Sequence, residues 1–144
     1  MHGRYFLDTN VFVYSFDAGE PDKARRARKL VRDAVSTGKG VVSYQVVQEF
    51  FNVAMRKFDR PMTTADAEQY LTTVFRPLLT VQSSAALFLE ALRVMSRYQV
   101  SWFDSLIVAG ALESNCTSLL SEDFQHGLRI GNLRVENPFL PAKA

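Results

Sequence analysis

The chain has 144 residues, of which 47% are hydrophobic and 22% are charged, and it contains only 7 Gly and 5 Pro. This composition excludes a disordered or collagen-like chain and predicts a single globular domain over residues 1–144. Seventeen Lys and Arg against fifteen Asp and Glu give a net charge of +2, which is too small to indicate a nucleic-acid-binding protein by itself.

The sequence also bears on where the protein works. Its one cysteine, Cys116, is expected to be a small core residue. The polar residues that follow Met1 do not form a secretory signal, and no apolar run approaches the ~18 residues that would span a bilayer. We therefore expect a soluble cytoplasmic protein that makes no contact with a membrane.

The first elements are a short apolar strand and a basic helix. We expect a buried strand from Arg4 to Leu7, a helical turn from Val11 to Phe16, and a helix from Glu20 to Ser36 that ends at Gly38. The polar faces of this helix carry Lys23, Arg25, Arg26, Arg28, Lys29 and Arg32. Such a stripe either contacts RNA phosphates or is a solvated helix face, and the pattern leaves both interpretations open.

Strands and helices alternate through the rest of the chain. The expected strands are 40–43, 78–82, 117–121 and 133–136, and the expected helices are 44–58, a helix from Thr63 or Thr64 to 75, 84–98 and 102–115. This order predicts an α/β sandwich, with a parallel sheet covered by helices on both faces. The two helices within residues 44–76 form an αα-hairpin, which is expected to project as a clip.

Four acidic residues stand where the pattern favours apolar or small residues. Asp8 and Asp123 follow strand ends, Glu49 lies in the second turn of a helix that leaves a strand, and Asp104 lies in the first turn of a helix that runs back. In a parallel sheet these positions meet at the carboxyl edge of the strands. We therefore expect the four carboxylates to converge, although they are distant in sequence.

Each acid also has a purely structural interpretation. Asp8 would cap the turn after the first strand, Ser101 and Asp104 fit a capping box, and Asp123 would form an Asx turn. Glu49 fits a structural role least well, because it lies in the middle of a helix beside two phenylalanines.

Carboxylates gathered at one edge repel each other and favour a bound divalent cation. Two charges about 4 Å apart interact at about 4 kcal/mol when the effective dielectric constant is near 20. Ligation by oxygen alone suits Mg²⁺, with Mn²⁺ as an alternative. Zinc is disfavoured, because the only histidines, His2 and His126, do not belong to a cluster with ligand spacing.

At these residues the sequence resembles the PIN-domain nucleases, and most closely the VapC-type toxin ribonucleases of toxin–antitoxin pairs. The segment Leu7-Asp8-Thr9-Asn10-Val11 is similar to the first family motif. Glu49 matches the second acid, Asp104 in 102–107 the third, and Asp123 in 119–123 the fourth. The resemblance covers essentially the whole chain in order.

The resemblance implies a three-layer sandwich with a parallel five-stranded sheet and a Mg²⁺- or Mn²⁺-dependent endoribonuclease that leaves a 5′-phosphate and a 3′-hydroxyl. Asp8, Glu49, Asp104 and Asp123 would be both catalytic and metal-binding. Asn10 and Ser121 would orient these carboxylates. Glu122 adjoins Asp123, and the family spacing favours Asp123 as the inward residue and Glu122 as a solvated one.

The resemblance also implies partners: an RNA substrate, and a small antitoxin protein whose arginine would reach the acidic cluster. The hairpin carries Phe50, Phe51, Met55 and Phe58, and a surplus of apolar side chains there would indicate a partner groove or a homodimer. Two other functions stay open: a PIN-fold module that binds RNA or protein without cutting, and a phosphatase with an aspartate nucleophile. The phosphatase is disfavoured because that class has a second Asp where Asn10 stands.

Overall fold

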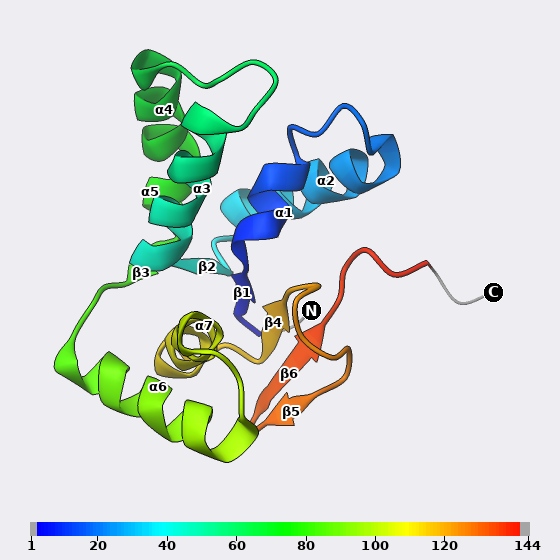
Figure 1. Cartoon of the computed structure of the whole chain (residues 1–144). Coiled ribbons are helices and arrows are strands. Elements are labelled where there is room, and N and C mark those ends of the chain that lie inside the picture. The colour runs from blue at the N-terminus through cyan, green and yellow to red at the C-terminus, as the bar shows by residue number, and fades with distance from the viewer. Residues whose placement is uncertain (1–2, 142–144) are drawn as a thin grey trace.

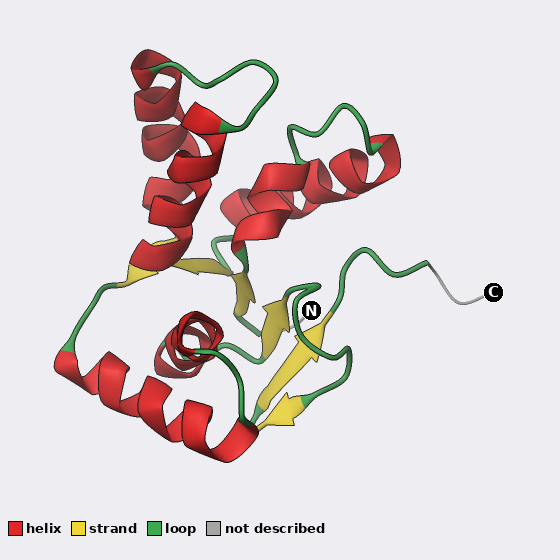
Figure 2. Ribbon diagram, viewed as in Figure 1, coloured by secondary structure: helices red, strands yellow, loops and turns green. Residues whose placement is uncertain are grey.

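The computed structural model describes residues 3–141, which form a mostly parallel sheet flanked by helices (Figure 1, Figure 2). The six strands lie in the order β3-β2-β1-β4-β6-β5. Their bounds are β1 Tyr5–Leu7, β2 Gly40–Ser43, β3 Leu79–Val81, β4 Ser118–Leu120, β5 Arg129–Ile130 and β6 Leu133–Glu136. The helices are α1 Thr9–Tyr14, α2 Pro21–Thr37, α3 Tyr44–Arg56, α4 Thr64–Tyr70, the π-helical segment η1 Leu71–Phe75, α5 Arg76–Leu78, α6 Ala85–Tyr98 and α7 Trp102–Glu113.

Strand β1 is the centre of the sheet. It pairs in parallel with β2 on one side and with β4 on the other, and Tyr5 lies opposite both Gly40 and Ser118. All residues of β1, β2 and β4 are buried, as expected for parallel strands that are covered on both faces. The α/β fold with a parallel sheet is therefore confirmed.

The sheet has one strand more than the five expected. Residues Arg129–Ile130 form β5, which pairs antiparallel with β6 through Arg129–Arg134 and Ile130–Leu133. Two residues are too few to show a period-2 pattern, so this edge strand has no signal in the sequence.

Different helices cover the two faces of the sheet. A Cβ built on Gly40 would lie 2.4 Å from the Ala34 Cβ, so α2 packs closely on the face to which Gly40 belongs. A Cβ built on Gly110 of α7 would lie 3.4 Å from the Phe6 ring, and Phe6 alternates with Tyr5 on β1. Because successive side chains of a strand point to opposite faces, α2 and α7 lie on opposite faces and the molecule has three layers.

The hairpin of α3 and α4 projects away from the sheet (Figure 1). Thr63 caps α4 in a complete capping box with Asp66, which fixes the start of the second arm. The fully buried ring of Phe50, on the first arm, lies against aromatic rings of the second arm and of α1, at centroid distances of 5.1 Å from Tyr70, 5.3 Å from Phe75 and 6.4 Å from Phe12. An aromatic cluster that includes Phe12 therefore packs the two arms together and joins the hairpin to α1.

Two further expectations concern the core and the membrane. Cys116 is buried, with its Sγ 3.3 Å from the Ser114 Oγ, so its expected role as a small core residue is confirmed. Within residues 3–141 no helix combines the length and the apolar character that a membrane crossing requires.

Candidate active site

The four predicted acids lie around the carboxyl ends of β1 and β4. Asp8 follows β1 directly, and Asp123 lies three residues after the end of β4. Glu49 lies in α3, which begins immediately after β2, and Asp104 lies in the first turn of α7. Asp8 interacts electrostatically with Asp123 and Glu49, and Asp123 interacts with Asp104 and Glu49. The structure thus brings the four carboxylates into one site.

Asp8 is the most buried of these acids. Its side chain accepts hydrogen bonds from the Ser121 Oγ and from the Thr9 backbone N–H, both at 2.7 Å, and only 5% of the residue is exposed. Burial raises the pKa of Asp8 from 3.8 to about 6; the two hydrogen bonds oppose this shift, and the charges of Asp123 and Glu49 add to it. Asp8 also occupies the N-cap position of α1. It therefore caps a helix, as the structural interpretation expected, and also lies in the acidic site.

Asp123 faces the other acids from an exposed position. The Asn10 Nδ2 lies 3.4 Å from each of its carboxylate oxygens, and its backbone N–H donates to the Ser121 Oγ at 3.1 Å. Partial burial raises the pKa of Asp123, and the nearby charges of Asp104, Glu122 and Glu49 raise it further. Asn10 and Ser121 therefore make the contacts to Asp123 and Asp8 that the resemblance implied.

Glu122 is not the freely solvated residue that we expected. It accepts hydrogen bonds from the Tyr14 hydroxyl and, at 3.3 Å, from the Lys23 Nζ. The Lys23 ammonium also lies 4.5 Å above the centroid of the Tyr14 ring. Glu122 thus turns away from the four acids toward α1 and α2, while its neighbour Asp123 turns toward them.

Both oxygens of the Glu49 carboxylate accept hydrogen bonds. The Thr9 Oγ1 donates to Oε2 at 3.0 Å, and the Gln45 Nε2 donates to Oε1 at 2.6 Å. The Gln45 amide also donates to the Phe103 carbonyl oxygen at 3.1 Å. Sequence analysis did not identify Thr9 or Gln45; the available signal was a glutamine four residues before Glu49, on the same face of an apolar helix.

Asp104 takes part in only half of the predicted capping box. The Ser101 Oγ accepts from the Asp104 backbone N–H at 3.2 Å and so caps α7. No hydrogen bond from the Ser101 N–H to the Asp104 carboxylate is found within residues 3–141. The carboxylate is therefore not used to close the box, and it interacts with Asp123 instead.

The acidic side chains of the site do not stand in the positions of a complete metal-ligand set in the described part of the chain. Over the described part of the chain, no group of three or more His, Cys, Asp or Glu side chains is positioned to hold an ion. The donor chemistry nevertheless fits Mg²⁺, which usually binds one or two protein carboxylates and keeps several waters. His126 accepts from the Asn137 backbone N–H at 3.0 Å, and His2 lies outside the described residues.

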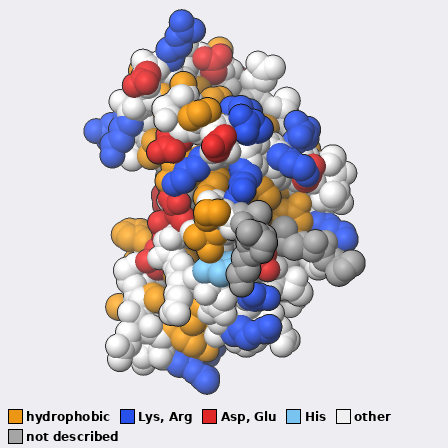
Figure 3. Space-filling model, turned by 90° about the vertical axis from the view of Figure 1, so that its right-hand side faces the viewer, with side chains coloured by type: hydrophobic (Ala, Val, Ile, Leu, Met, Phe, Trp, Pro, Cys, Tyr) orange, Lys and Arg blue, Asp and Glu red, His pale blue; other side chains and the backbone are white. Residues whose placement is uncertain are grey.

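The basic stripe of α2 is largely engaged within the molecule. Ion pairs join Lys23 to Glu122, Arg25 to Asp22 and Lys29 to Asp33, while Arg26 and Arg28 donate to backbone carbonyls. On the face shown in Figure 3, Asp and Glu side chains lie among the Lys and Arg side chains rather than apart from them. RNA binding by this stripe stays a prediction.

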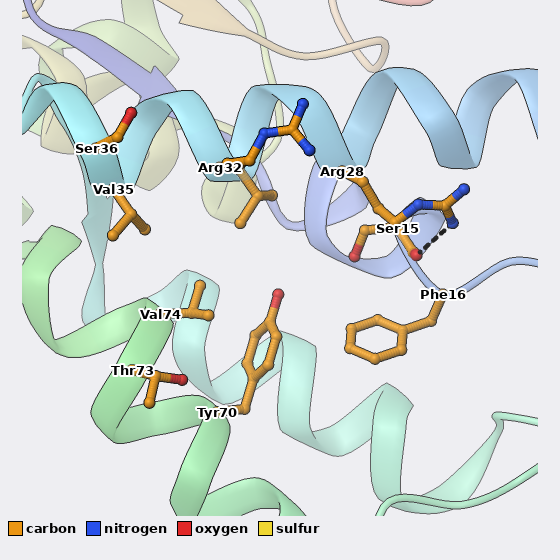
Figure 4. Close-up of a pocket in the computed structure, with 10 residues that line it drawn as sticks. Ser15, Phe16, Arg28, Arg32, Val35, Ser36, Tyr70, Thr73 and Val74 are labelled. Atoms are coloured by element: carbon orange, nitrogen blue, oxygen red, sulfur yellow. Dashed lines mark hydrogen bonds between the residues drawn. The ribbon is translucent and has the colours of Figure 1, made fainter.

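An apolar groove separates α2 from the second arm of the hairpin (Figure 4). It has a volume of about 540 Å³, and its lining includes Phe16, Val31, Val35, Tyr70 and Val74. Arg28 and Arg32 of α2 also line this groove, and Arg28 donates to the Ser15 carbonyl at 3.2 Å. We call this cavity the α2–hairpin groove.

The larger exposed apolar surface lies on α6 rather than on the hairpin. On the hairpin Phe50 is buried, Phe51 and Phe58 are half-buried, and only Met55 of the four predicted residues is exposed. On and next to α6, by contrast, the exposed large apolar side chains are Phe88, Leu89, Leu92, Met95 and Phe103. Phe103, which adjoins Asp104, is 65% exposed.

The parallel sheet and the carboxylates at its edge define an α/β protein with an acidic site, and comparisons identify its family. A family model for the PIN domain matches residues 5–127. The chain belongs to the PIN-domain family. A sequence search among curated proteins found no significant match.

Solved structures of low sequence identity share this fold. A toxin–antitoxin complex from Klebsiella pneumoniae is 14% identical with a TM-score of 0.68, and the alignment covers 94% of this chain and 98% of that one. VapBC2 from Rickettsia felis, bound to a promoter DNA fragment, is 17% identical with a TM-score of 0.64, covering 92% and 97%. VapC20 from Mycobacterium tuberculosis, a toxin that cleaves the sarcin–ricin loop, is 20% identical with a TM-score of 0.60, covering 83% and 91%.

Proposed function

We propose that this protein is a Mg²⁺- or Mn²⁺-dependent endoribonuclease and the toxin of a toxin–antitoxin pair. The observation that carries the proposal is the convergence of Asp8, Glu49, Asp104 and Asp123 at one edge of a PIN-family sheet. The fold similarity to toxins that include a sarcin–ricin-loop-cleaving protein supports it. We place the activity in the cytoplasm, where cellular RNA is the substrate.

The proposed reaction is hydrolysis of an RNA phosphodiester bond. A divalent ion bound by one or two of these carboxylates would supply charge neutralisation at the phosphate and acidify a water molecule. Among the acids, Asp123 is the best placed to accept a proton from water, because it is exposed and its pKa is raised. Asp8 is buried and held by two donors, so its part is to bind and orient.

The arrangement of Asn10 and Ser121 supports the same division of roles. Asn10 contacts the Asp123 carboxylate, whereas the Ser121 hydroxyl donates to Asp8 and accepts from the Asp123 backbone. Ser121 therefore links β4 to β1 at the point where the two acids approach each other. Such supporting contacts fix the direction of ligand oxygens before substrate arrives.

The antitoxin is proposed to occupy the α2–hairpin groove. Its apolar lining suits an apolar helix face, and the guanidinium groups of Arg28 and Arg32 suit acidic residues that flank that face. Co-expression with the product of a neighbouring small open reading frame tests this placement. Val35→Glu is expected to abolish co-purification, because it places a carboxylate in the apolar lining.

A homodimer is proposed through the exposed apolar face of α6. The surface formed by Phe88, Leu89, Leu92 and Met95 follows helical spacing, and such a contiguous apolar surface favours association. Light scattering on the purified chain is expected to give the mass of two copies, and Leu92→Glu the mass of one. A monomeric wild type would contradict this assembly.

Brief expression in cells tests the catalytic proposal. The wild type is expected to create new RNA ends at a small number of sites, each with a 5′-phosphate, and Asp8→Asn is expected to create none. If both proteins leave cellular RNA unchanged, the alternative applies: a PIN-fold module that binds RNA or protein without cutting.

A further inference from the structure

Gln45 occupies a position of α3 that the helical pattern assigns to the core. Val46, Phe50 and Ala54 are fully buried on this helix, and Gln45 is only 5% exposed. A buried amide destabilises a protein unless its polar atoms are paired. Its Oε1 is buried and has no hydrogen-bond partner in the described part of the chain. Packing and stability alone therefore favour a leucine or methionine at this position.

The Nε2 group of the same amide donates two hydrogen bonds, and both acceptors belong to the candidate active site. Nε2 donates to the Glu49 Oε1 at 2.6 Å, one helical turn further along α3. It also donates to the Phe103 carbonyl oxygen at 3.1 Å, in the first turn of α7. Phe103 directly precedes Asp104. One side chain thus connects two helices that each carry a predicted acid.

The second oxygen of Glu49 is held from a third element. The Thr9 Oγ1 donates to Oε2 at 3.0 Å, and Thr9 directly follows Asp8 in the first turn of α1. The Glu49 carboxylate is therefore held at both oxygens, by Gln45 from within α3 and by Thr9 from α1. Rotation of this carboxylate would break at least one of the two bonds.

We propose that Gln45 is a positioning residue of the active site: its amide orients the Glu49 carboxylate and fixes it relative to the turn that carries Asp104. The inference rests on the proposed function, because it assigns Gln45 to that site. The unpaired Oε1 lowers the stability of the folded chain. It is buried because the Nε2 of the same amide must reach both Glu49 and the Phe103 carbonyl. Gln45 does not touch the substrate and acts through Glu49.

The test replaces the amide without changing the size of the side chain. Gln45→Met removes both donors and the unpaired acceptor, and it is expected to lower kcat about 10–100-fold, the usual effect of removing a group that orients a metal ligand. The KM for RNA is expected to stay unchanged, the dissociation constant for Mn²⁺ to rise, and the melting temperature to stay equal or increase. Gln45→Ala serves as a second variant if the first folds poorly.

A matched control lies on the same helix. Gln48 is exposed one position before Glu49, so Gln48→Met makes the same chemical change without breaking a contact to the site. Gln48→Met is expected to keep the wild-type kcat and Mn²⁺ affinity. In a Glu49→Gln background, Gln45→Met is expected to add nothing, because Gln45 acts through Glu49.

The outcomes distinguish a failure of the positioning role of Gln45 from a failure of the proposed nuclease function. A Gln45→Met protein with wild-type kcat and wild-type Mn²⁺ affinity, or one whose loss persists in full in the Glu49→Gln background, overturns the positioning role. A wild type that cuts no RNA overturns the proposed function, while Mn²⁺ titration by paramagnetic resonance still decides the role of Gln45. A wild type that binds no Mn²⁺ overturns both.

Discussion

Replacing Asp8 with asparagine tests whether Asp8 is an acid of a metal site or only a structural cap of α1. Folding raises the pKa of Asp8 from 3.8 to about 6, so the ionised carboxylate is disfavoured in the folded chain. A shift of this size corresponds to about 3 kcal/mol of unfolding free energy. This penalty is absent below pH 3.8, grows as the pH rises, and is complete above pH 6.

An asparagine side chain in place of Asp8 would carry no charge at any pH, and it could still accept from the Thr9 N–H and donate to the Ser121 hydroxyl. We therefore expect Asp8→Asn to be more stable than wild type by up to about 3 kcal/mol at pH 7 in the presence of EDTA. In a domain of this size the gain amounts to a rise in Tm of about 10 °C. Below pH 4 the two proteins are expected to melt together.

The assay is thermal unfolding with EDTA at several pH values between 3 and 8. Asp59→Asn is the matched control, because it makes the same charge change at an exposed loop residue and is expected to leave Tm within about 2 °C at all pH values. An Asp8→Asn protein that is less stable than wild type by a similar amount at every pH would refute the reasoning and leave Asp8 as a helix cap.

Three more variants and conditions probe the fold and the site. Millimolar Mn²⁺ is expected to raise the Tm of wild type but not that of Asp8→Asn, because an ion that binds only the folded chain stabilises it; calorimetry that shows no wild-type shift contradicts a formed site. Gly40→Ala is expected to lose about 1–3 kcal/mol in urea titration, since its Cβ would lie 2.4 Å from the Ala34 Cβ; an unchanged midpoint means that α2 yields easily. Lys23→Met is expected to lose only about 1 kcal/mol, because the Lys23 side chain is 34% exposed in its ion pair with Glu122; a much larger loss in the same titration would mean that the paired Glu122 charge is effectively buried.

The sequence was sufficient to predict the fold because hydrophobic periodicity and chain order determine a parallel sheet. The expected strands at 40–43 and 133–136 agree with β2 and β6, and the helix expected from Glu20 to Ser36 agrees within one residue with Pro21–Thr37. Boundaries that depend on backbone hydrogen bonding were less predictable. The first helix begins at Thr9 rather than Val11, because Asp8 caps it, and the π-helical segment Leu71–Phe75 leaves no pattern in the sequence.

Convergence of the acids could also be predicted, because it depends only on which ends of parallel strands lie together. The bonds that orient each acid could not, because they depend on side-chain packing between elements distant in sequence. Glu122 contacts Tyr14 and Lys23, which are 108 and 99 residues away, and the Gln45 amide contacts Phe103, which is 58 residues away. Such contacts have no local sequence signal, and only the folded arrangement reveals them.

Cleavage of structured RNA by the purified chain is the most direct test of the proposed nuclease. With Mn²⁺ or Mg²⁺ we predict discrete products with 5′-phosphate ends, no cleavage after EDTA is added, and no cleavage by an Asp104→Asn protein that folds normally. Cleavage that survives both EDTA and Asp104→Asn, or an active metal-free preparation, would contradict the account.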